Sequence, residues 1–116
     1  MTGEGPQLTS QMVRMLGALL NASTEDWYGL ELAKAANLSS GTIYPALARL
    51  ERMGWVESFW EDVDPSEIGR PRRRLYRLTG QGERSAIAAI EELAKELERA
   101  RAGYAQPRLT PRGQPA

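Results

Sequence analysis

Cysteine and histidine are both absent from this chain of 116 residues. Their absence removes disulfides, zinc sites built on thiolate or imidazole, cysteine nucleophiles and histidine-based catalytic triads. No other constellation of nucleophile, base or metal ligands takes their place. We therefore predict that the protein is not an enzyme and that it has neither a cofactor nor a metal site.

The chain also lacks a long hydrophobic run and an excess of charge. Nothing approaches the ~18 consecutive apolar residues that a membrane span needs. The start, MTGEGPQLTS, has neither the basic nor the apolar region of a signal peptide. We expect a cytoplasmic protein without membrane contact. Its 15 basic and 15 acidic residues cancel, so any contact with nucleic acid must come from a local basic patch.

The length suits one domain with a real hydrophobic core. Residues 1–8 contain two glycines and one proline without periodicity, and we expect them to be flexible. Order should begin at Thr9 or Ser10, either of which can cap a first helix. Apolar residues then recur at the spacing of one helix face: Met12, Met15, Leu16, Leu19 and Leu20.

Two further helices follow, joined by a three-residue turn. The first should cover residues 28–36, where Asn37 suits a left-handed C-terminal cap. Ser39 can cap the next helix, which is expected from about residue 40 to residue 53. Proline within a helix is tolerated only near the first turns, so we expect an irregular start, with Pro45 stiffening the front end.

A β-hairpin and a long helix complete the pattern. The segments WVESFWEDV and RRRLYRL have the composition of strands, and turn formers fill the long tip between them. Thr79 can cap a last helix over residues 80–104, and we expect residues 105–116 to be disordered. Apolar residues in that helix recur in steps of four and three, as in a coiled-coil seam: Ala86, Ile90, Leu93, Leu97, Ala100 and Tyr104. We predict that this seam, with Met12 and Leu16, forms a homodimer interface.

This order of elements predicts a mainly α fold with a small β-hairpin. Residues 9–79 would form a winged helix-turn-helix, followed by a C-terminal dimerisation helix. In that architecture the second helix of the motif enters the major groove, and the residues near its N-terminus face base edges. The candidates are Ser39, Ser40, Thr42, Tyr44 and Arg49. Residue by residue, helix capping by the serines and a solvated Arg49 are equal alternatives, so this prediction depends on the architecture.

The densest charge feature is the segment RPRRRLYR, which places five arginines in eight residues: Arg70, Arg72, Arg73, Arg74 and Arg77. On a wing these side chains suit DNA phosphates, and each contact should add roughly 0.9 to the salt dependence of binding. The alternative is pairing with the acidic run Glu61, Asp62, Asp64 and Glu67. We expect some arginines to pair in this way, because an acidic wing tip repels DNA.

Aromatic and acidic clusters offer two more interpretations. Tryptophans placed like Trp27, Trp55 and Trp60 most often pack in a core or at a hinge. Stacking on an aromatic effector in a dimer cavity is the less favoured alternative. The acidic side chains of the last helix are typical of a solvated helix face rather than of a metal site: Glu91, Glu92, Glu96 and Glu98.

The segments YGLELAKAANLSSGTIYPALARLERMGWVES and GRPRRRLYRLTGQG resemble the PadR family of bacterial transcription regulators, a likeness that spans roughly residues 12–97. The resemblance implies that the helix bearing Gly41, Thr42, Tyr44 and Pro45 reads the operator, and that Arg72 to Arg74 lie in the basic part of the wing. It also implies a homodimer built through the last helix. Such proteins commonly repress a neighbouring gene and are released by a small hydrophobic or aromatic effector. The chain resembles the short subfamily, which has no separate ligand domain.

We therefore predict a sequence-specific regulator that binds double-stranded operator DNA as a dimeric repressor. The alternative from another class is a winged-helix module that docks a protein partner without operator binding. The balanced net charge and the acidic wing tip would permit that alternative.

Overall fold

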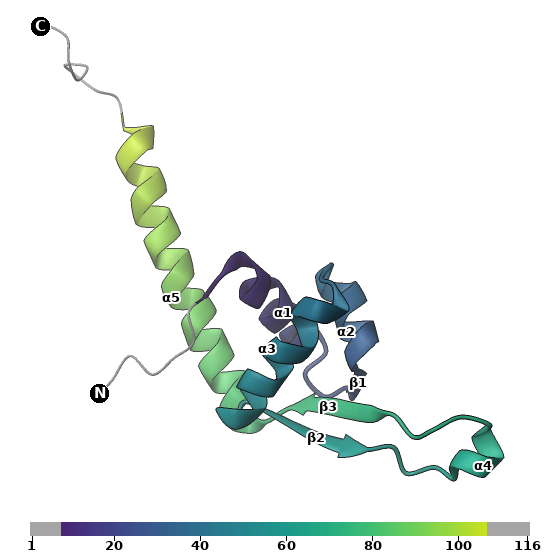
Figure 1. Ribbon diagram of the computed structural model, residues 1–116. Coiled ribbons are helices and arrows are strands. Elements are labelled where there is room, and N and C mark those ends of the chain that lie inside the picture. Colours follow the sequence, from purple (N-terminus) through teal and green to yellow (C-terminus); the bar gives the residue numbers. More distant parts are fainter. Residues whose placement is uncertain (1–7, 107–116) are drawn as a thin grey trace, which may run out of the picture.

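A computed structural model describes residues 8–106 of the chain (Figure 1). Its elements are α1 (Ser10–Asn21), β1 (Trp27–Tyr28), α2 (Gly29–Ala36), α3 (Ser40–Arg52), β2 (Val56–Trp60), α4 (Pro65–Ile68), β3 (Arg74–Leu78) and α5 (Gly80–Ala105). This is the mainly helical fold with a small antiparallel sheet that the sequence predicts. The flexibility predicted for residues 1–8 and the disorder predicted for residues 105–116 mostly concern residues outside the described range. At the inner boundaries both predictions are wrong, because Leu8 packs against the core and Ala105 is the last residue of α5.

The hydrophobic core lies where α1, α2 and α3 meet. Leu16, Leu32 and Leu47, one from each helix, have no exposed surface, and burial of each such side chain contributes about 1.5–3 kcal/mol. Met12 joins them with 5% of its surface exposed, and Ala86 of α5 belongs to the same core and has no exposed surface. The prediction that Met12, Leu16 and Ala86 contact a second subunit is therefore wrong, because the protomer's own core covers all three.

The helices begin and end largely where the sequence predicts, because specific side chains satisfy their free backbone groups. Thr9 Oγ1 accepts a hydrogen bond from the amide of Met12 at 3.1 Å, and Ser39 Oγ accepts one from Thr42 at 3.2 Å. Asn37 ends α2 in the left-handed conformation with φ of 58°. The expected irregular start of α3 is wrong, since the helix is continuous from Ser40 and accommodates Pro45 in its second turn.

The sheet has three strands in the order β1-β3-β2, all antiparallel. The two residues of β1 pair with β3, and a strand so short carries no periodic signal in the sequence. The tip of the hairpin contains the single turn α4, which Asp64 caps. We call the hairpin of β2 and β3, together with its tip, the wing.

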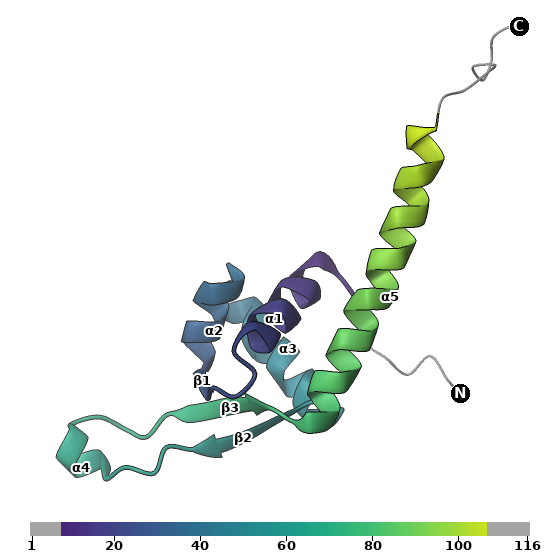
Figure 2. The same cartoon turned by 180° about the vertical axis from the view of Figure 1, so that it is seen from behind.

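The C-terminal helix α5 packs on the body only through its first half. Ile90 is half-buried against the core, whereas Leu97 and Tyr104 are 62% and 74% exposed. Figures 1 and 2 show the far half of α5 projecting from the body, away from the wing. Within the described residues, no helix is both long and apolar enough to cross a membrane.

Candidate nucleic-acid interface

The helix α3 presents one face to the core and the opposite face to solvent. Ile43, Leu47 and Leu50 are fully buried, as the spacing of an amphipathic helix requires. Over the first three turns the exposed face has Tyr44 and Arg49 at its edges and carries small or compact residues along its middle: Gly41, Pro45 and Ala48. A small, exposed middle lets another surface approach this helix closely.

The two serines at the start of α3 have different surroundings. Ser39 Oγ caps the helix and donates to Thr42 Oγ1 at 3.1 Å, so the capping role is realised for this hydroxyl. Ser40 is exposed. Of the pair, Ser40 is therefore the better placed for contact with another molecule.

Tyr44 lies at the edge of α3 that faces the wing. Its ring rests directly against Gly29, where an added Cβ would stand 2.4 Å from Tyr44 Cε1. The absence of a side chain at Gly29 is what allows this close contact. Tyr44 borders a hollow of about 350 Å³ between α2, α3 and the wing, which Arg73 and Arg74 also line. The structure thus brings together three of the candidate residues, from two separate elements.

The remaining α3 candidates lie at the other edge of the helix. Thr42, Pro45 and Arg49 line a smaller hollow of about 200 Å³ between α3 and the start of α1. Arg49 and Pro45 are exposed, and Thr42 is half-buried. The candidates on α3 therefore form two groups, one beside the wing and one beside α1.

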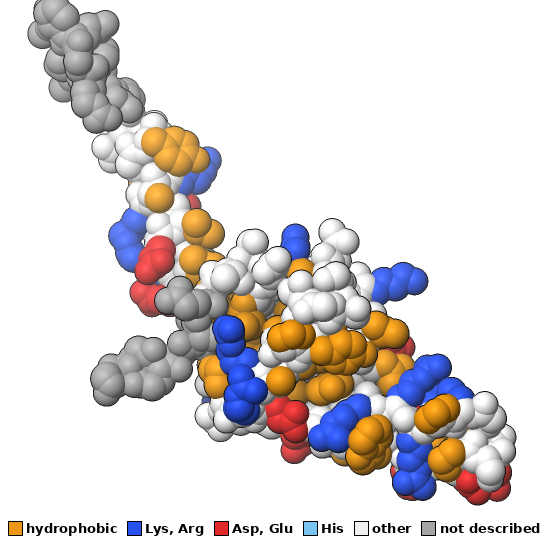
Figure 3. Space-filling model, in the orientation of Figure 1, with side chains coloured by type: hydrophobic (Ala, Val, Ile, Leu, Met, Phe, Trp, Pro, Cys, Tyr) orange, Lys and Arg blue, Asp and Glu red, His pale blue; other side chains and the backbone are white. Residues whose placement is uncertain are grey.

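The wing arginines divide by what they contact. Arg70 forms an ion pair with Glu61 at 2.7 Å, so its guanidinium is engaged inside the wing and the prediction that it contacts DNA loses its support. Arg72 Nε donates to the carbonyl of Val63 at 2.8 Å. Arg73 and Arg74 are exposed and lie over aromatic rings, those of Tyr28 and Trp60. Arg74 also forms an ion pair with Glu51 of α3 at 3.9 Å, but this pair is longer than that of Arg70 and exposed to solvent. Figure 3 shows arginine and hydrophobic side chains side by side along the wing.

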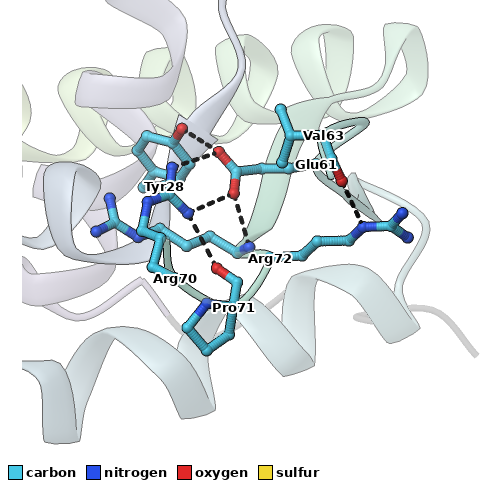
Figure 4. A network of polar contacts seen from close by, with 7 residues as sticks. Tyr28, Glu61, Val63, Arg70, Pro71 and Arg72 are labelled. Carbon is cyan, nitrogen blue, oxygen red and sulfur yellow. Dashed lines mark hydrogen bonds and ion pairs between the residues drawn. The ribbon is translucent and has the colours of Figure 1, made fainter. Parts of the chain in front are cut away.

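Glu61 is the centre of a polar network at the outer end of β2, where the paired strands of the wing lead into its tip (Figure 4). Its side chain is only 6% exposed. It accepts hydrogen bonds from Tyr28 Oη at 2.5 Å, from both terminal nitrogens of Arg70 at 2.7 and 3.1 Å, and from the amide of Arg73 at 2.8 Å. Tyr28 is also the N-cap residue of α2, and its amide donates to Glu31 Oε1 at 3.0 Å, so the network ties the wing to the helix-turn-helix. The expected pairing of the acidic run with arginine is confirmed at Glu61, whereas the burial of Glu61 and its bond to Tyr28 have no signal in the sequence.

The network makes the stability of the fold depend on pH in a defined direction. Hydrogen bonds from Arg70 and Tyr28 lower the pKa of Glu61 from 4.5 to about 2. A carboxyl whose pKa is lower in the folded state stabilises the fold fully above its unfolded pKa, and this contribution is lost as the pH falls toward the folded value. We expect Glu61→Gln to destabilise the protein at neutral pH and to lessen the loss of stability on acidification from about pH 4.5 to 2. Urea unfolding of both proteins at neutral pH and within that window measures this, and equal losses would contradict it.

Three helices around one core, with a helix-turn-helix formed by α2 and α3 and a wing after it, define the winged helix-turn-helix class. Solved structures share the fold. The chain superposes on a PadR family regulator from Eggerthella lenta with a TM-score of 0.67 at 22% identity, covering 84% of this chain and 87% of that one. It superposes on MepR of Staphylococcus aureus, solved as a complex with DNA, with a TM-score of 0.61 at 20% identity, covering 85% and 67%. At these identities the likeness is one of fold.

Family membership follows from sequence similarity rather than from the fold. The model of the transcriptional regulator PadR-like family matches residues 18–88, and the chain belongs to this family. Transcriptional regulator Rv3488 of Mycobacterium tuberculosis is 42% identical over 76 residues, which cover 61% of this chain and 65% of that protein. The resemblance identified from the helix-turn-helix and wing segments is thereby confirmed.

Proposed function

We propose that the protein is a sequence-specific DNA-binding regulator that binds operator DNA through α3 and the wing. The observation that carries this proposal is the shared hollow that Tyr44, Arg73 and Arg74 line. It gives α3 and the arginines of the wing one continuous exposed surface. In a winged helix-turn-helix, such a surface lets one element enter the major groove while the other follows the adjacent backbone.

Different residues of this surface suit base recognition and phosphate contact. Gly41 and Ala48 leave room for α3 to approach base edges, and the Tyr44 ring and the Arg49 guanidinium at its two edges supply groups that can distinguish bases. Arg73 and Arg74 suit the phosphates, because their guanidinium groups carry a permanent charge and several donors. In this arrangement phosphate contacts position the protein, and contacts from α3 specify the sequence.

The regulator acts as a homodimeric repressor in this proposal. Two facts support dimerisation through α5: the seam residues after Leu93 are all exposed, and Leu97 and Tyr104 are among the most exposed large hydrophobic side chains of the described residues. A second copy of the helix would remove this apolar surface from water. Release by a small hydrophobic or aromatic effector and the location in the cytoplasm stay predictions.

We expect Arg73→Ala with Arg74→Ala to weaken binding to operator and random DNA alike, and to lower the slope of log affinity against log salt by roughly 2. Tyr44→Ala should instead reduce the preference for operator over random DNA, with the slope unchanged. Fluorescence anisotropy titrations at several salt concentrations measure both quantities. Arg101→Ala, an exposed arginine on α5, is the matched control. Weak, salt-insensitive binding by the unaltered protein would favour a module that docks a protein partner.

We expect Leu97→Glu to produce monomers, because it places a charge in an apolar seam without touching the protomer's own core. Analytical ultracentrifugation reports the change in mass. Ala102→Glu adds the same charge to the same helix outside the seam and should leave the dimer intact. A dimer that survives Leu97→Glu would place the interface elsewhere.

A further inference from the structure

Trp60 is the most exposed of the three tryptophans, with 57% of its surface accessible. Trp55 lies in the core, and Trp27 packs against it, as the sequence led us to expect of tryptophans in general. Trp60 stands instead at the end of β2, where the strand leaves the body. Leaving so large an apolar ring in water forgoes the stabilisation that its burial would give. Packing within the protomer therefore does not account for it.

The pairing register shows which way Trp60 faces. Side chains two residues apart on a strand share a face of the sheet, so Trp60 lies on the same face as Ser58. Ser58 Oγ donates to the carboxylate of Glu51 in α3 at 2.6 Å. The face of the sheet that carries Trp60 is thus the one turned toward α3. Trp60 lies on this face two residues closer to the tip of the wing than Ser58, where α3 no longer covers the sheet.

The Trp60 ring is held in place by an arginine that belongs to the candidate interface. The guanidinium of Arg74 lies over the ring, 5.1 Å from its centroid, while Arg74 Nε donates to Ser58 Oγ at 3.1 Å. Arg74 also lines the hollow that it shares with Tyr44. The ring and the charge therefore form one amphipathic surface beside the hollow, linked to α3 through Ser58 and through the ion pair of Arg74 with Glu51.

We propose that Trp60 is a DNA-contacting residue, which lays its indole ring against deoxyribose and base edges while Arg74 holds the adjoining phosphate. This inference rests on the proposed function and adds to it an apolar contact from the wing. A DNA duplex that occupies the hollow between α3 and Arg74 would also contact the exposed ring of Trp60, which lies beside that hollow. The contact removes apolar surface from water and neutralises no phosphate, so it contributes affinity that does not depend on salt.

The test compares Trp60→Ala with Phe59→Ala. Phe59 is the neighbouring residue on the same strand and also has an arginine over its ring, with Arg77 Cζ 4.9 Å from the centroid. It lies on the opposite face of the sheet, away from α3, and so is the matched control. Anisotropy titrations with operator DNA give affinity and salt slope for each variant. Thermal unfolding checks that each variant is folded.

We expect Trp60→Ala to weaken binding roughly tenfold, equivalent to about 1.4 kcal/mol, with an unchanged salt slope, and Phe59→Ala to leave both quantities as they are. In the unaltered protein, duplex should also shield a tryptophan from acrylamide quenching, and Trp60→Phe should abolish this shielding. Unchanged affinity in Trp60→Ala would overturn the inference while leaving operator binding established. A lowered slope would overturn it too, since Trp60 would then act only by positioning Arg74. Failure of the unaltered protein to bind any duplex would reject the proposed function itself.

Discussion

Gly82→Ala is expected to unfold much of the protein at temperatures where the unaltered chain is folded. Gly82 lies in the first turn of α5, where an added Cβ would stand 2.0 Å from the carbonyl oxygen of Trp55 and 2.8 Å from its Cα. These are backbone atoms at the base of the wing, and they cannot swing aside as a flexible side chain can. The same carbonyl accepts the amide of Thr79 at 2.9 Å, so relief of the clash would also strain the joint between wing and helix.

The size of the effect follows from the rigidity of this joint. Overpacking a core typically costs about 1–3 kcal/mol and sometimes more, and contact with backbone places Gly82→Ala at the upper end. For a domain of this size, about 3 kcal/mol lowers the melting temperature by more than about 10 °C. Differential scanning calorimetry measures the shift. Gly17→Ala, with no atom within 4 Å of its added Cβ, should instead stabilise α1 by about 0.5–1 kcal/mol. A similar melting temperature for both variants would contradict the close contact at Gly82.

The helices could be predicted from the sequence because their evidence is local. The apolar stripe of α1 and the caps at Thr9, Asn37 and Ser39 each involve residues within a few positions of one another. The strand β1 and the turn α4 are too short to show a period, and they exist because β3 and the folded tip hold them. A stripe of apolar residues along a helix also predicts that this face of the helix is buried, but it does not predict which element covers the face. The prediction from the stripe therefore places Met12 and Leu16 against a partner, whereas the protomer's own core covers them.

The candidate interface was predictable in outline and less so in detail. The sequence places Tyr44 on the second helix of the motif and Arg73 and Arg74 on the wing, but only the fold brings them to one hollow. The anchoring role of Glu61 cannot be predicted from the sequence, because its hydrogen-bond partners Tyr28 and Arg70 are 33 and nine positions away along the chain. Buried carboxylates are rare unless they are paired. The sequence therefore predicts that the acidic run pairs with arginine, but not that one carboxylate of the run is buried as an anchor.

Ala48→Glu is expected to abolish operator recognition without harming the fold. Ala48 lies in the middle of the exposed face of α3, between the edges formed by Tyr44 and Arg49. Glutamate is a good helix former, and no core contact is lost, so the melting temperature should barely change. In the major groove of DNA, however, the longer glutamate side chain would hold α3 away from the base edges. Its negative charge would also be repelled by the neighbouring phosphates. Specific binding exceeds non-specific binding by about 10³-fold or more, so we expect affinity for operator to fall on the order of 100-fold or more, toward the level of random DNA.

The matched variant for this test is Ala88→Glu, which adds the same charge at an exposed position of α5. Its net charge equals that of Ala48→Glu, so any difference between the two in anisotropy titrations reports where the charge lies rather than how much charge the protein carries. We expect Ala88→Glu to bind operator nearly as the unaltered protein does. If both variants bind equally well, α3 does not enter the groove, and the wing alone would have to account for binding. If both lose binding equally, long-range repulsion rather than contact at α3 decides affinity, and the loss should then shrink as salt is added.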